Sequence, residues 1–191
     1  MGEFPKQAYD TEPAQMVHTA DPFMEEYALR DRFSVRPRIE AGDKAVISDS
    51  SRMTWYAPPL AKAWLENQSQ MQQWPNDLKE KIRRRDEDVL SRYLVFQVYL
   101  ESQIQQLGML PTVKHRVEMQ LMDDQENVYN PIDIQEGLGA QLSIKGAPTL
   151  TVFFPKEDRN GKELVMQDRW LHLVLLIDGS RYFFDFPMQR V

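Results

Sequence analysis

The chain has 191 residues, a formal net charge of −6 and no cysteine. Its length suits one domain with appendages, and a chain of this size buries enough surface to fold without a metal or a disulfide. The acidic balance argues against a general nucleic-acid binder, because phosphate contacts need a basic surface. The missing cysteine excludes disulfides, thiolate metal sites and cysteine nucleophiles. No apolar stretch reaches the roughly 18 residues of a membrane-spanning helix, so no transmembrane segment is expected.

The first part of the chain is predicted to lack regular structure. Residues 1–22 contain three prolines among polar residues and show no sustained apolar period, which is typical of an extended or disordered arm. Residues 23–191 are predicted to form a single domain. Weak alternation between residues 23 and 48 predicts strands around Phe33 and Val35, and Pro37 limits the first of these to an edge or a broken strand.

Residues 58–91 are predicted to be helical. Leu60, Trp64, Met71 and Trp74 recur at helical steps after two prolines that suit a helix N-terminus. The Trp74-Pro75 step then breaks or kinks this helix. A second helix is expected to follow, with Asn76 or Asp77 as its cap and a charged outer face.

From Tyr93 the pattern changes to that of strands. Residues 93–100 are rich in β-branched and aromatic side chains, although a helix continued through Leu107 is the competing interpretation. One face of this strand is predicted to carry Leu94, Phe96, Val98 and Leu100. Further strands are predicted around residues 117–121, 128–134, 142–144 and 149–154, with turns at 123–127 and 158–161.

The clearest prediction is a terminal hairpin over residues 170–186. Its two apolar runs meet at a turn centred on Asp178-Gly179 or on Gly179-Ser180. The two registers differ by two residues, so the same side chains share a face in both. That face is predicted to place Leu171, Leu173, Leu175 and Ile177 opposite Tyr182, Phe184 and Phe186.

These elements predict a β-rich α+β fold. About seven strands follow residue 93, with a turn signal every 8–12 residues or so and no long helix between them. We therefore expect an antiparallel, immunoglobulin-like β-sandwich over residues 93–188, with the one or two helices of residues 58–91 before it.

No catalytic or metal-binding motif stands out. The three histidines, His18, His115 and His172, lack the spacing of a metal site. In the predicted hairpin, His172 faces Asp185 on the polar side, and such a pair can orient an imidazole. An exposed or sheet-packed pair is the simpler interpretation, because no nucleophile motif accompanies it. No catalytic residue, cofactor or metal is therefore expected.

An acidic cluster and an aromatic cluster remain. Asp123, Asp124 and Glu126 could supply oxygen ligands for calcium, but the EF-hand pattern is absent, and a solvated hairpin tip is favoured. Near the Pro-Pro step, the aromatic residues Trp55, Tyr56 and Trp64 are the candidate ligand-binding residues, since Trp and Tyr often anchor binding. The alternative is that they pack a helix onto a sheet.

The helical stretch at 60–65, the aromatic strand at 93–100 and the closing hairpin at 171–187 resemble those of uncharacterised bacterial lipoproteins and secreted proteins. The resemblance covers roughly residues 53–188 and is one of pattern, so it carries no functional residue. It implies an exported domain, periplasmic or associated with the outer membrane, whose native precursor had a leader and a lipid-bearing cysteine.

The expected function is that of a non-catalytic envelope or secreted module that binds a protein partner, an envelope component or another surface ligand. One alternative is a cytosolic or host-directed interaction protein whose N-terminal arm folds on a partner. Another is an enzyme that uses His172 and Asp185.

Overall fold

The computed structural model describes residues 21–39, 47–100, 117–136, 149–165, 170–177 and 180–188. These residues form three helices and two antiparallel sheets of five strands each. The helices are α1 (Pro22–Arg32), α2 (Pro58–Met71) and α3 (Asn76–Arg92). The strands are β1 (Ser34–Val35), β2 (Arg38–Ile39), β3 (Arg52–Trp55), β4 (Tyr93–Tyr99), β5 (Val117–Asp123), β6 (Val128–Tyr129), β7 (Asp133–Glu136), β8 (Thr149–Pro155), β9 (Trp170–Ile177) and β10 (Ser180–Pro187).

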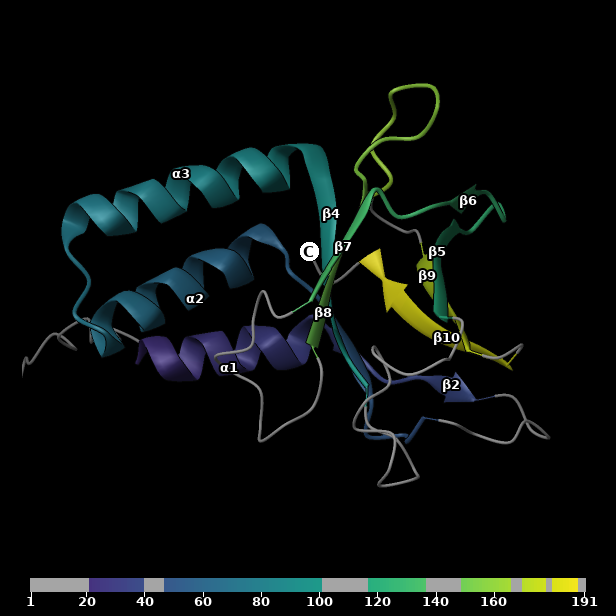
Figure 1. The fold of residues 1–191 in the computed structure, drawn as a ribbon, viewed down its shortest axis with the longest axis horizontal. Coiled ribbons are helices and arrows are strands. Elements are labelled where there is room, and N and C mark those ends of the chain that lie inside the picture. Colours follow the sequence, from purple (N-terminus) through teal and green to yellow (C-terminus); the bar gives the residue numbers. More distant parts are fainter. Residues whose placement is uncertain are drawn as a thin grey trace, which may run out of the picture.

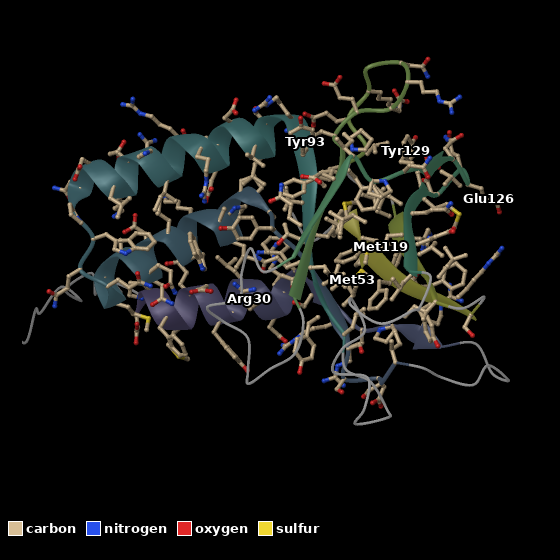
Figure 2. The ribbon with its side chains drawn as sticks, viewed as in Figure 1. Arg30, Met53, Tyr93, Met119, Glu126 and Tyr129 are labelled. Carbon is tan, nitrogen blue, oxygen red and sulfur yellow. The ribbon has the colours of Figure 1, made fainter. Side chains whose placement is uncertain are left out.

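The two sheets pack face to face. Sheet A has the strand order β1-β3-β4-β8-β7, and sheet B has the order β2-β10-β9-β5-β6. The rings of Phe96 on β4 and Phe186 on β10 lie 5.1 Å apart in the core between the sheets. Figure 2 shows Met53 of β3 and Met119 of β5 in the same layer. The predicted β-rich α+β sandwich is confirmed at this level, and it also includes strands that precede residue 58.

The terminal hairpin has the predicted faces. Leu175 pairs with Tyr182 and Leu173 with Phe184, and all four side chains are fully buried. The pairing of Ile177 with Ser180 leaves two residues between the strands, as in the register centred on Asp178-Gly179. Residues 178 and 179 themselves lie outside the described residues.

Strand β4 lies at the centre of sheet A, between β3 and β8. Leu94, Phe96 and Val98 point into the core, as their alternation predicts. The competing helix is therefore wrong for residues 93–99, and the predicted strand at 142–144 lies outside the described residues. The stretch predicted as one strand at 128–134 forms β6 in sheet B and the start of β7 in sheet A.

All three helices lie on the sheet A side of the sandwich, and sheet B forms the opposite side (Figure 1). The two helices predicted within residues 58–91 are present, and the chain breaks between them at Trp74-Pro75. The predicted cap of α3 is wrong, because Pro75 occupies the N-cap position and no side chain caps this end. No helix among the described residues is long and apolar enough to span a membrane.

Helix α1 was not predicted, and the weak strand pattern that begins at residue 23 is wrong for residues 22–32. The Asp21 side chain accepts a hydrogen bond from the N–H of Phe23, and Pro22 follows it at the first helical turn, a favourable start for a helix. The buried face of α1 carries Glu26, whereas Met24 and Tyr27 are exposed. Leu29 packs against the core on the same side, but one apolar residue marks the inner face too weakly for the helical period to stand out in the sequence. Pro37 does separate two edge strands, β1 and β2, at the point where the chain passes from sheet A to sheet B.

Candidate functional site

The outer face of sheet B carries a row of aromatic and charged side chains. Leu171, Leu173 and Phe184 point into the core, so the residues that alternate with them point outward. Five outward residues are linked by contacts, and we call them the sheet B strip. They are Trp170 and His172 on β9, Phe183 and Asp185 on β10, and Arg38 on β2. Because all three helices lie on the other side of the sandwich (Figure 1), no described helix covers this face.

Asp185 is held at both of its carboxylate oxygens. Nδ1 of His172 lies 2.7 Å from Oδ1, and Nε of Arg38 donates to Oδ2 at 3.0 Å. A carboxylate only accepts hydrogen bonds, so Nδ1 of His172 carries the proton. Burial alone would raise the pKa of Asp185, but the hydrogen bonds from His172 and Arg38 hold it below its ordinary value. Asp185 is therefore ionised at neutral pH and orients both partners.

An aromatic ring adjoins each end of this charged group. The Trp170 ring lies parallel to the His172 ring, with an interplanar angle of 7° and 6.4 Å between centroids. The Arg38 guanidinium lies 4.9 Å above the centroid of Phe183, within the range of a cation–π contact. Trp170 is 47% exposed. The strip is thus a chain of mutually positioned side chains that ends in an exposed indole.

The predicted pair of His172 and Asp185 is brought together, and its geometry can orient an imidazole. Its surroundings on the described part of the face supply no nucleophile: Met122 lies opposite His172 on β5, and Trp170 and Val174 adjoin it on β9. Asp185 is also shared with Arg38, which stabilises its charge. Within the described ranges, no group of three or more His, Asp or Glu side chains could hold a metal ion.

The three predicted ligand-binding residues have different surroundings. Trp55 is buried in the core, with its ring edge-on to Phe33 at 5.6 Å. The ring of Trp64 on α2 meets that of Trp74 edge-on at 6.2 Å. Tyr56 follows β3 and lies among charged side chains. The described contacts do not assemble the three into one site.

Tyr56 lies where the helices meet sheet A. Burial and then the nearby Asp86 carboxylate raise the pKa of its hydroxyl. Close by, the buried carboxylate of Glu26 accepts hydrogen bonds from Nη2 of Arg30 at 2.9 Å and Nδ2 of Asn67 at 2.6 Å. Nη1 of Arg30 donates to Oε1 of Gln97 at 2.8 Å, and Figure 2 shows Arg30 at the end of α1 that adjoins the sheet. We call Glu26, Arg30, Tyr56, Asn67 and Gln97 the polar junction.

The acidic cluster closes a turn. The Asp123 carboxylate accepts hydrogen bonds from the N–H groups of Gln125 and Asn127, from the Asn127 amide and from the Tyr129 hydroxyl, at 2.9 to 3.0 Å. Burial alone would raise the pKa of Asp123, and these bonds hold it below its ordinary value. Asp124 and Glu126 are exposed, and Figure 2 shows Glu126 at the outer tip. The predicted solvated hairpin tip is confirmed for Asp124 and Glu126, whereas it is wrong for Asp123, which is buried.

One pattern in the sequence does point to the sheet B strip. Trp170 and Phe183 occupy positions that alternate with the buried residues of the hairpin, so the same alternation places two large aromatic side chains on the outer face of sheet B, where an apolar patch is informative. No sequence pattern indicates the place of Arg38, because its partner Asp185 lies 147 residues away in the sequence.

Comparison with known proteins identifies a similar fold. No family model and no curated protein matches the chain. A solved structure, that of a "novel protein of unknown function" from Burkholderia pseudomallei K96243, is similar with a TM-score of 0.56 and 13% sequence identity. The match covers 88% of this chain and 85% of that one. At this identity the likeness is one of fold: a β-rich α+β architecture of two antiparallel sheets with helices.

Proposed function

We propose that the chain is a non-catalytic binding module that docks a protein partner on the sheet B strip. The observation that carries the proposal is the exposed indole of Trp170 stacked beside the His172–Asp185–Arg38 group. Trp and Arg dominate the binding energy of protein interfaces when neighbouring groups hold them in place. Here both are already positioned, so docking would cost little side-chain entropy.

The composition of the face favours a protein partner. Met122, Leu176 and Phe183 are partly buried on it, and aromatic residues, Met and Arg are the types enriched in protein interfaces. The charge on Asp185 is compensated by Arg38 within the strip. A matching partner would therefore present an apolar pocket for the indole, with polar groups around it.

The setting is part of the proposal. We infer an envelope or secreted location, with a lipid anchor in the native precursor, from the resemblance in pattern to bacterial lipoproteins and secreted proteins. We also propose that the sandwich is immunoglobulin-like, and domains of this class often use their exposed surfaces for recognition. The two packed antiparallel sheets support it.

Site-specific cross-linking in the native host tests the proposal. A photo-reactive amino acid would replace Arg181, which is exposed on the same face of β10, or Arg84, which is exposed on α3. We expect one protein to be cross-linked from position 181 and none from position 84, with the adduct lost when Trp170→Ala is added. The absence of any adduct at position 181, or the same adducts from both positions, would overturn it.

A further inference from the structure

Helix α1 presents apolar side chains to solvent. Phe23, Met24 and Tyr27 are all more than half exposed, and their spacing places them on one side of the helix. The other side carries Glu26, which bonds to α2, and Leu29, which packs against the core. The apolar side of α1 therefore faces outward, the reverse of the usual arrangement in a surface helix.

Met71 of α2 extends this apolar side. Helices α1 and α2 run in opposite directions (Figure 1), and Nδ2 of Asn67 donates a hydrogen bond to Glu26 at 2.6 Å. Met71 lies about one turn beyond Asn67 on α2, and Phe23 lies about one turn before Glu26 on α1. These two exposed side chains are thus at the same end of the helix pair. We call the four exposed apolar residues the helical patch: Phe23, Met24, Tyr27 and Met71.

The helical patch has the size of the apolar part of a dimer contact. Its four residues are between 52% and 68% exposed. A large side chain offers roughly 200 Å², so the patch exposes on the order of 500 Å². Contiguous apolar surface of this size on one protein commonly marks an interaction site. A standard contact buries about 800 Å² on each partner, and homodimer contacts are about 65% apolar, which also corresponds to about 500 Å².

The charges that flank the patch favour a second copy of the chain as the partner. Glu25 in the first turn of α1 and Arg32 in its last turn are both exposed. They are about two helical turns apart, so they lie along the same edge of the helix. When two copies of α1 meet around a two-fold axis perpendicular to the helix, the acidic turn of each copy faces the basic turn of the other. One chain therefore supplies both halves of a complementary contact.

We propose that the helical patch is the contact of a homodimer in which two α1 helices pack antiparallel. Tyr27 lies near the two-fold axis, and the small, exposed Ala28 beside it allows the helices to approach closely. The helices and sheet B lie on opposite sides of the sandwich (Figure 1), so this dimer leaves both copies of the sheet B strip exposed. The inference does not depend on the docking role of that strip.

Sedimentation equilibrium of the full chain tests the proposal. We expect the mass to rise with concentration from that of one chain to that of two, with a dissociation constant in the micromolar range. Tyr27→Lys places a charge in the contact and should weaken the dimer at least about tenfold. Ile132→Lys, at a similarly exposed apolar residue outside the helices, is the matched control and should leave the dimer unchanged. Trp170→Ala should also leave it unchanged, which separates dimerisation from docking on the sheet B strip.

Charge reversal tests the antiparallel arrangement. Glu25→Arg or Arg32→Glu alone puts two like-charged pairs into the homodimer, whereas a dimer of one variant with the other has two opposite pairs. We expect each variant alone to dimerise at least about tenfold more weakly than the unmodified chain, and the mixed dimer to regain the original affinity.

Three results would overturn the homodimer: a chain that is monomeric at every concentration, a dimer that Tyr27→Lys leaves intact, or equal weakening by Ile132→Lys. A monomeric chain would leave the helical patch to a different protein. A mixture of the two charge variants that dimerises no more tightly than either variant alone would overturn the antiparallel contact.

Discussion

His172 and Asp185 face each other across the β9–β10 ladder, with 2.7 Å between Nδ1 and Oδ1 on the outer face of sheet B. The same carboxylate accepts a hydrogen bond from Arg38, so one side chain connects three strands. The direction of the pKa shift of Asp185 determines the pH range in which these hydrogen bonds stabilise the fold. Because the pKa of Asp185 is lower in the folded chain, its contribution is present above the ordinary carboxyl value and is lost as pH falls through the folded value.

We therefore expect Asp185→Asn to lower the free energy of unfolding by about 1 kcal/mol at pH 7. The difference from the unmodified chain should shrink as pH falls through the lowered pKa of Asp185. Urea unfolding at several pH values measures both. Asp124→Asn, an exposed carboxylate in the β5–β6 turn, is the control and should leave stability unchanged at pH 7. A loss for Asp185→Asn that is independent of pH would contradict the electrostatic explanation.

A larger effect is expected from Asp123→Asn. The amide would turn one acceptor oxygen into a donor facing the Asn127 amide or the backbone N–H groups of the turn. Because Asp123 is buried, the unpaired groups cannot recover their bonds with water, and we expect a loss of about 2 kcal/mol. Urea unfolding compares it with Asp124→Asn, the neighbouring exposed residue. Equal effects of the two substitutions would show that the carboxylate does not hold the turn.

High pH should destabilise the folded chain through the hydroxyl of Tyr56. The pKa of its hydroxyl is raised in the folded chain, first by burial and then by Asp86. The unfolded chain therefore loses this proton at about pH 10 while the folded chain keeps it. The free energy of unfolding is therefore unaffected by this hydroxyl below about pH 10 and decreases as the pH rises above that value. Tyr56→Phe should reduce this decline, as measured by thermal unfolding between about pH 9 and 11. The same slope in both proteins would contradict the prediction.

The sequence predicts elements whose signal is local. The alternation in β4 and in the β9–β10 hairpin follows a period of two, because one face of each strand is buried. In α1 the signal fails, since Glu26 faces inward and Tyr27 outward. Burial alternation then predicts the wrong element here, and the helix is selected by its favourable start at Asp21 and Pro22 together with its packing against α2.

The residues of the candidate site also differ in whether a local pattern in the sequence predicts their places. The facing of His172 and Asp185 follows from hairpin register, which the turn determines. The place of Arg38 depends on the pairing of β2 with β10, and no local pattern reports such a pairing. Trp55 and Tyr56 are adjacent in sequence, yet Trp55 packs on Phe33 whereas Tyr56 lies among charges from α1 and α3. Proximity in sequence was therefore a poor guide to a shared site.

Substitutions of two residues on β9 should distinguish a loss of partner binding from a loss of stability. Trp170→Ala should remove partner binding while lowering the free energy of unfolding by less than about 1 kcal/mol, because the indole is 47% exposed. Leu173→Ala, three residues along β9 and fully buried, should instead cost about 2–5 kcal/mol through the cavity that it leaves. Thermal unfolding gives the stability of each variant, and cross-linking from position 181 gives its binding. If Trp170→Ala destabilised the chain as much as Leu173→Ala, the indole would belong to the fold and could not serve as a docking anchor.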